Sequence, residues 1–73
     1  EAAKKKLTKK QCRKKVVKYL KKNDLWKSSY ILEYDHKVDN WFVFHYYEDM
    51  GDHTATINWY QVNRNNGQIV PMF

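Results

Sequence analysis

The sequence predicts an α+β fold in which one N-terminal amphipathic helix packs on a three- to four-stranded antiparallel β-sheet, ordered as a meander. Apolar residues first recur at helical spacing, and beyond residue 30 they recur at a spacing of two. Short turns separate the segments of the second half, and short turns join antiparallel neighbours. At 73 residues the chain has the length of a single domain.

The helix is expected over residues 9–22. Thr8 and Gln11 match a capping box, in which the threonine oxygen accepts a hydrogen bond from the Gln11 amide while the glutamine side chain reaches back. An apolar stripe at i, i+4, i+7 and i+8 follows, with Val17 at its margin, and consists of Cys12, Val16, Tyr19 and Leu20. The pattern ends near residues 23–24.

Strands are expected wherever the spacing of two continues between turn signals. The segments are YILEYDH (30–36), WFVFHYYE (41–48), HTATINWYQVN (53–63) and QIVPMF (68–73), separated by KVDN, DMGD and RNNG. Gly67 supplies the positive φ that hairpin turns favour, and Pro71 marks the last strand as an edge or as ending there. Residues 1–6 are expected to be the end of a linker, and residues 7–73 to form one domain.

The start of the helix and the final hairpin carry a family resemblance. The segments LTKKQC and VNRNNGQI (62–69) resemble the helix start and the Val-Asp-x-x-x-Gly-x-Ile/Val hairpin of PepSY-type domains, with Asn63 replacing the usual acidic residue. The resemblance extends from Leu7 to Val70. It implies an extracytoplasmic, non-catalytic, protein-interacting module of Gram-positive secreted proteins or lipoproteins, in some relatives associated with protease propeptides and inhibition.

Positive charge is concentrated at the start of the chain. Residues 1–27 hold eleven Lys and one Arg against two acids, which is +10, whereas residues 28–73 hold two cations against six acids, which is −4. A lysine-rich helix face can neutralise the phosphates of nucleic acid, of teichoic acid or of anionic lipid headgroups. It can equally be a solvated face that keeps a small domain soluble. The candidate binding lysines are Lys14, Lys18 and Lys21.

Aromatic residues supply a second candidate surface. Three Trp, six Tyr and three Phe are many for this length, and one helix covers only one face of a sheet. The candidates are Trp41, Tyr46, Trp59 and Tyr60, which can recognise a peptide, a glycan or single-stranded nucleic acid. The competing interpretation is structural, because cross-strand aromatic pairs stabilise small sheets. Alternation places Trp59 and Tyr60 on opposite faces.

Catalysis, metal binding and cofactor binding receive no support from the sequence. His36, His45 and His53 lack a tight ligand spacing, so no metal site is predicted. The sequence contains neither a phosphate-binding loop nor a nucleophile elbow, so we expect no enzyme and no cofactor. Cys12 is the single cysteine and cannot form an internal disulfide.

These observations favour a non-catalytic extracytoplasmic interaction or structural domain of a bacterial envelope or secreted protein. We expect it to bind a protein or an envelope component through its sheet face or a sheet edge, and to be a monomer. A membrane tether before residue 1 is compatible with this expectation. The alternative is a small nucleic-acid-binding domain that uses its basic N-terminal helix.

Overall fold

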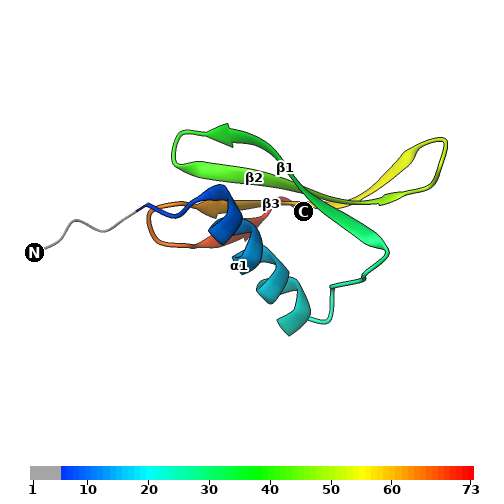
Figure 1. The fold of residues 1–73 in the computed structure, drawn as a ribbon, viewed down its shortest axis with the longest axis horizontal. Coiled ribbons are helices and arrows are strands. Elements are labelled where there is room, and N and C mark those ends of the chain that lie inside the picture. Colours follow the sequence, from blue (N-terminus) through cyan, green and yellow to red (C-terminus); the bar gives the residue numbers. More distant parts are fainter. Residues whose placement is uncertain (1–5) are drawn as a thin grey trace, which may run out of the picture.

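The computed structural model describes residues 6–73 and confirms the α+β fold: one helix packs on a four-stranded antiparallel meander (Figure 1). The elements are α1 (Lys9–Lys22), β1 (Tyr30–Val38), β2 (Trp41–Asp49), β3 (Thr54–Asn63) and β4 (Ile69–Pro71). The strands lie in the sheet in chain order, β1-β2-β3-β4. The linker end expected at residues 1–6 falls outside the described residues except for Lys6, which is exposed.

The predicted bounds of the helix are confirmed, and its ends have identifiable causes. The Gln11 amide donates to Thr8 Oγ1 at 3.1 Å, and the Thr8 amide donates to Gln11 Oε1 at 2.9 Å, so both halves of the capping box form. At the other end Asn23 Nδ2 donates to the Tyr19 carbonyl at 2.8 Å. Asp24 then takes a positive φ of 57°, which turns the chain away from the helix axis.

The sheet departs from the prediction at its turns. The expected turn at 37–40 is too long, because β1 continues through Val38 and only two residues, Asp39 and Asn40, connect it to β2. Asp39 has a φ of 53°, as a tight two-residue hairpin requires. β3 begins one residue later than expected, at Thr54, and β4 has three residues in place of six.

Two β-bulges re-aim side chains within this sheet. One bulge lies in β1, where the register with β2 changes between Tyr34 and His36. The other lies in β3, opposite Tyr46 and Tyr47 of β2. A bulge inserts one unpaired residue, so alternation shifts by one position beyond it. His36 therefore pairs with Val43 on the sheet face opposite to that of Tyr34.

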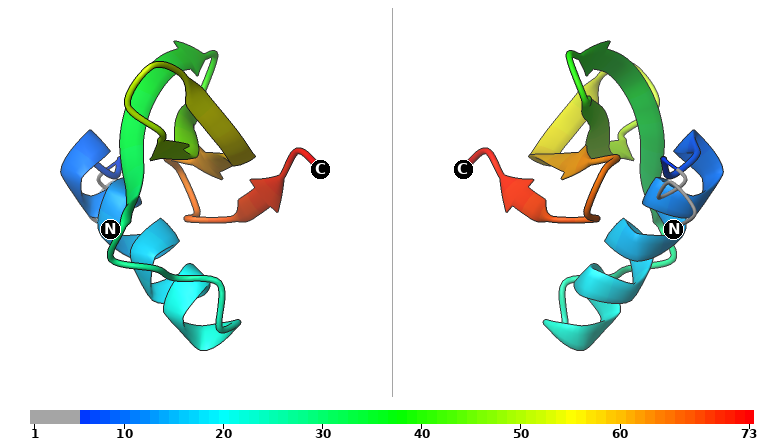
Figure 2. Two further views of the ribbon diagram at one scale, coloured as in Figure 1. Left: turned by 90° about the vertical axis from the view of Figure 1, so that its right-hand side faces the viewer. Right: turned by 90° about the vertical axis from the view of Figure 1, so that its left-hand side faces the viewer.

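The core lies between α1 and one face of the sheet. From α1 it receives Cys12, Val16 and Leu20, each fully buried as the apolar stripe predicts. The sheet contributes Leu32, Phe42, Phe44, Tyr46, Tyr60 and Val62. The two views along the long axis show α1 to one side of a strongly twisted sheet (Figure 2). Because one helix covers one face, the other face remains open.

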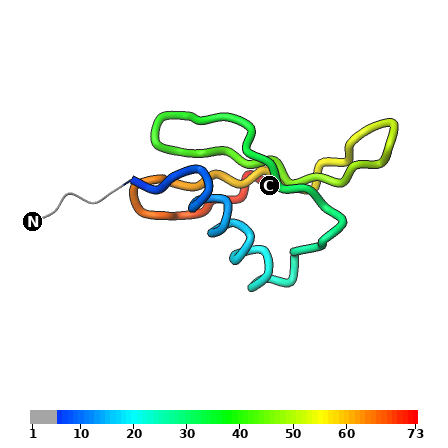
Figure 3. The backbone as a smooth tube through the Cα atoms, in the orientation of Figure 1, coloured from blue at the N-terminus to red at the C-terminus, as the bar shows by residue number. Residues whose placement is uncertain are grey.

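Backbone hydrogen bonds join the start of the helix to the β3–β4 hairpin. The Leu7 amide donates to the Arg64 carbonyl at 2.8 Å, and the Arg64 amide donates to the Asn40 carbonyl at 2.8 Å. The chain leading into α1 accordingly runs beside the turn between β3 and β4 (Figure 3). This attachment holds one flank of α1 above the hairpin that contains Gly67.

Candidate functional site

The sheet face opposite α1, called the open face here, carries a row of large side chains. Register places Val38 beside Trp41, His36 beside Val43, and His45 beside Trp59. None of these side chains belongs to the core cluster beneath α1. The open face therefore includes His36, Val38, Trp41, Val43, His45, Tyr47, Trp59 and Gln61.

Three flat rings stack across the centre of the open face. The ring centroids of His45 and Trp59 lie 4.0 Å apart at an interplanar angle of 11°, and those of His45 and Tyr47 lie 4.5 Å apart at 26°. His45 Nε2 is 2.8 Å from Thr56 Oγ1, and the Tyr47 hydroxyl donates to Glu33 Oε1 at 3.3 Å. We call Trp59, His45 and Tyr47 the aromatic ladder. Its side chains are half-buried, so ring surface remains accessible.

An apolar groove of about 320 Å³ adjoins the ladder. It is lined by His36, Val38, Val43, Trp59, Gln61, Met72 and Phe73. The residues after β4 form one wall, because the Met72 amide donates to the Trp59 carbonyl at 2.9 Å and the Phe73 amide donates to Asn58 Oδ1 at 3.2 Å. Val38 is 48% exposed and Met72 51% exposed. Exposed apolar side chains that adjoin one another are typical of interaction sites.

The two sheet edges offer less to a partner than the open face does. On β1, Arg13 Nε donates to the Leu32 carbonyl at 3.1 Å, and the bulge at Asp35 interrupts the register. On β4 the edge has three residues and includes Pro71, which has no amide hydrogen. Bulges, charges and proline are devices that oppose strand addition.

The prediction of aromatic binding residues is wrong for two of the four candidates, because their side chains are buried. Tyr46 and Tyr60 are 0% and 2% exposed and lie in the core beneath α1, where a partner cannot reach them. The Tyr46 hydroxyl also donates to the Leu25 carbonyl and accepts from the Lys27 amide, each at 2.9 Å. Trp41 and Trp59 lie on the open face. Trp59 and Tyr60 occupy opposite faces, as alternation predicts.

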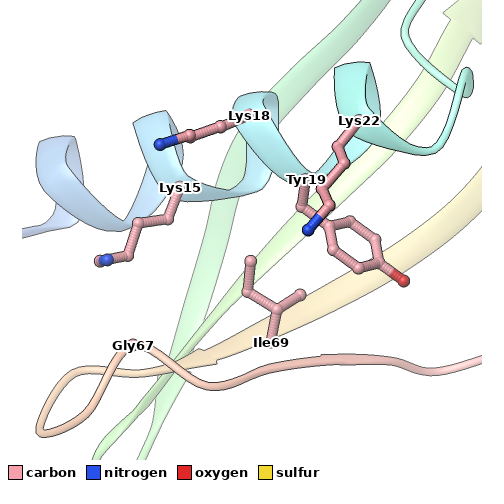
Figure 4. Close-up of a pocket in the computed structure, with 6 residues that line it drawn as sticks. All are labelled: Lys15, Lys18, Tyr19, Lys22, Gly67 and Ile69. Carbon is pink, nitrogen blue, oxygen red and sulfur yellow. The ribbon is translucent and has the colours of Figure 1, made fainter.

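One of the three predicted lysine candidates lines a cleft beside α1. Lys18 lines a cleft of about 260 Å³ between α1 and the β3–β4 hairpin, whereas Lys14 and Lys21 do not line it. This lysine cleft is formed by Lys15, Lys18, Tyr19, Lys22, Gly67 and Ile69 (Figure 4). Neither Lys15 nor Lys22 was among the predicted binding residues. Their spacing of seven residues, which places them on one flank of a helix, is the signal that could have found them.

Residues 6–73 contain no cluster of three or more His, Cys, Asp or Glu side chains able to hold a metal ion. His36 and His53 instead contact the aspartates that precede them, at 2.5 Å to Asp35 and 2.6 Å to Asp52.

Cys12 is fully buried, and burial raises the pKa of its thiol against the opposing effect of Arg64 and Lys15. In the same described range α1 is neither long nor apolar enough to cross a membrane.

Comparisons with known proteins assign this chain to no family. No family model matches it, and comparisons with curated proteins and with solved structures likewise gave no match. The resemblance to PepSY-type domains therefore stays a prediction. Functional proposals for this chain depend on the open face and on the lysine cleft.

Proposed function

We propose that this chain is a non-catalytic interaction domain that binds an apolar segment of a partner protein on the open face of its sheet. The observation that carries the proposal is the aromatic ladder adjoining the apolar groove. Stacked rings give a partner a large, rigid contact area with little conformational entropy to lose. The groove beside them accepts aliphatic side chains.

The chemistry of the open face favours a protein segment over a charged ligand. The groove combines the side chains of Val38, Val43 and Met72 with the indole of Trp59. Polar groups lie around it, namely His36 and Gln61, and these suit the polar rim of a protein interface. The edges are obstructed by Arg13 and Pro71, so we place the partner on the face and not along an added strand.

We further propose that the domain acts as a monomer outside the cytoplasm, in an envelope or secreted protein. The support is the resemblance of LTKKQC and of residues 62–69 to PepSY-type domains. Subcellular fractionation of the protein that contains this chain provides the test. We expect it in the envelope or secreted fraction, and recovery in the cytoplasm would reject this part of the proposal.

The interaction itself is tested with two matched pairs of lysine substitutions. Val38→Lys with Met72→Lys places two charges in the groove, whereas Met50→Lys with Ile57→Lys adds the same charge at exposed residues that do not line it. Partners are cross-linked to the wild-type domain in an envelope extract, purified, and titrated against each variant. We expect the groove pair to weaken binding at least about tenfold, because about 1–3 kcal/mol is lost when an apolar anchor is disrupted.

The control pair is expected to bind as the wild type does. Equal loss in both pairs would mean that added charge and not the groove is responsible, and that result contradicts the proposal. Failure to recover any specific partner from the envelope extract would also reject it. Sedimentation of the domain alone separates a partner from self-association, for which we expect a monomer.

A second candidate function, nucleic-acid binding, is favoured by a different observation. Three lysines line the cleft between α1 and the β3–β4 hairpin. That cleft shares no lining residue with the groove of the open face. The two surfaces can therefore be altered one at a time.

A further inference from the structure

We propose that the lysine cleft binds single-stranded nucleic acid. Backbone phosphates contact the ammonium groups of Lys15, Lys18 and Lys22, and one base packs on the floor formed by Tyr19 and Ile69. The proposal rests on the second candidate function above and names its ligand, and it concerns a site separate from the open face. It rests on three observations: the arrangement of the lysines, the lack of acidic partners for them, and the apolar surface of Tyr19 and Ile69 at the base of the cleft.

The cations are arranged along one flank of α1 and above a hairpin. Lys15 and Lys22 extend toward the β3–β4 segment, and Lys18 runs along the helix above Lys15 (Figure 4). The end of the Lys15 side chain lies against Gly67, where a Cβ would be 3.0 Å from Lys15 Cε. Gly67 also has a φ of 77°, which disfavours other residues. The hairpin therefore accommodates the stem of Lys15 at the margin of the cleft.

The charge of these lysines is not balanced by neighbouring acids. Among residues 6–73 no lysine nitrogen lies within 4.0 Å of a carboxylate oxygen, and the side chains that do contact a carboxylate at that distance are His36 and His53. Lys18 and Lys22 are four residues apart on the helix, a spacing at which like charges destabilise it. A bound polyanion would relieve this repulsion and release its own counterions.

The floor of the cleft distinguishes nucleic acid from other phosphate polymers. Tyr19 is half-buried, and its ring packs edge-on against Tyr60 at a centroid distance of 5.8 Å, which anchors it. Ile69 extends the same apolar surface. A base unstacked from a single strand can lie on such a ring, whereas a polymer of phosphate and glycerol has nothing to place there. In a duplex the base faces are stacked, so the single strand is favoured.

Fluorescence anisotropy with a labelled oligothymidylate of about 12 nucleotides tests the proposal, since that length exceeds one small site. With three phosphates neutralised, affinity should fall about 20-fold between ~50 and ~200 mM salt, because the slope for single strands is about −0.7 per phosphate. Absence of binding at the lower salt would overturn the proposal.

A charge-matched pair of triple variants locates the site. Lys15→Gln, Lys18→Gln and Lys22→Gln together remove the cleft cations, whereas Lys6→Gln, Lys10→Gln and Lys14→Gln remove three exposed cations that do not line the cleft. We expect at least a tenfold loss of affinity in the first variant and less than a threefold loss in the second. Equal losses would mean that net charge and not the cleft attracts the oligonucleotide, and would overturn the assignment.

The contribution of the base is tested with an abasic phosphodiester of the same length and with Tyr19→Leu. We expect the abasic polymer to bind the wild type more weakly than oligothymidylate does, and Tyr19→Leu to remove that difference. Equal affinity for both polymers would reduce the cleft to a phosphate site and refute the nucleic-acid assignment.

Urea denaturation confirms that each variant is folded. The groove pair Val38→Lys and Met72→Lys should bind oligothymidylate at least as well as the wild type.

Discussion

Tyr46 and Tyr47 are consecutive residues of β2, yet their side chains meet opposite environments. Tyr46 is fully buried beneath α1 and forms two hydrogen bonds with the segment that links α1 to β1. Tyr47 lies on the open face, at the end of the aromatic ladder. Partial desolvation and the adjacent Glu33 carboxylate raise the pKa of Tyr47. Residue type alone therefore does not separate a core tyrosine from a surface tyrosine.

The hydroxyl of Tyr46 should be a measurable source of stability. Tyr46→Phe removes two part-buried hydrogen bonds, to the Leu25 carbonyl and from the Lys27 amide, so at about 0.5–1.5 kcal/mol each we expect a loss of about 1–3 kcal/mol in the free energy of unfolding. Tyr47→Phe is the matched control and should change it by less than about 0.5 kcal/mol. Urea denaturation measures both. Equal effects would contradict the role assigned to the Tyr46 hydroxyl.

At the scale of elements, α1 combines a well-packed apolar side with an uncompensated basic one. Cys12, Val16 and Leu20 bury one side, and the capping box closes the N-terminus. The basic side holds a row of lysines at intervals of four residues, namely Lys10, Lys14, Lys18 and Lys22. Each adjacent pair in such a row is repulsive. Packing against the sheet therefore holds the helix in place against its own charge.

Reversing one charge in this row should stabilise the domain. Lys14→Glu converts two repulsive pairs, with Lys10 and Lys18, into attractive ones, for which we expect a gain of about 1 kcal/mol at low salt. Lys14→Gln removes the repulsion alone and should give roughly half that gain. Urea denaturation at low and at high salt measures the difference, which salt should diminish. A destabilised Lys14→Glu variant would show that repulsion along α1 is unimportant.

At the scale of the whole molecule, the two candidate surfaces lie on different parts of the fold. The lysine cleft lies between α1 and the β3–β4 hairpin, and the groove lies on the open face behind the core. Most of the positive charge belongs to residues 1–27, and six of the eight acids belong to residues 28–73. A protein segment and a single strand could therefore occupy the domain at the same time.

Alkaline pH should destabilise the whole fold. Burial raises the pKa of Cys12 against the opposing cations, and burial also raises the pKa of Tyr60. The folded state thus keeps these protons at a pH where the unfolded state has released them, and the free energy of unfolding falls as pH rises past the unfolded pKa values. Below the unfolded pKa values neither group lowers the free energy of unfolding.

Urea denaturation at several pH values between about 8 and 10 measures this loss, since an unfolded thiol ionises within that window. Cys12→Ala should show a shallower decline than the wild type, because it lacks the thiol. Identical declines in the two proteins, or a wild type whose stability does not change with pH, would contradict the contribution assigned to Cys12.

Much of the local structure was predictable from the sequence. The capping box at Thr8 and Gln11 and the apolar stripe of α1 depend on residues within a few positions of one another, and both are confirmed. The shorter turn at Asp39 and the two bulges were not predicted, because the opposing strand sets the register of each residue. The compartment and partner expected from the resemblance stay predictions.

By itself the sequence determined the helix, the alternation of the strands and the concentration of positive charge near one end. These properties follow from spacing and composition along the chain. Only the tertiary structure decided which alternating face α1 covers. That choice buried Tyr46 and Tyr60, left Trp59 and His45 stacked on the open face, and set Lys15 beside Gly67. The physical reason is that burial and clefts arise from contacts between residues distant in sequence. Local sequence patterns do not predict such contacts.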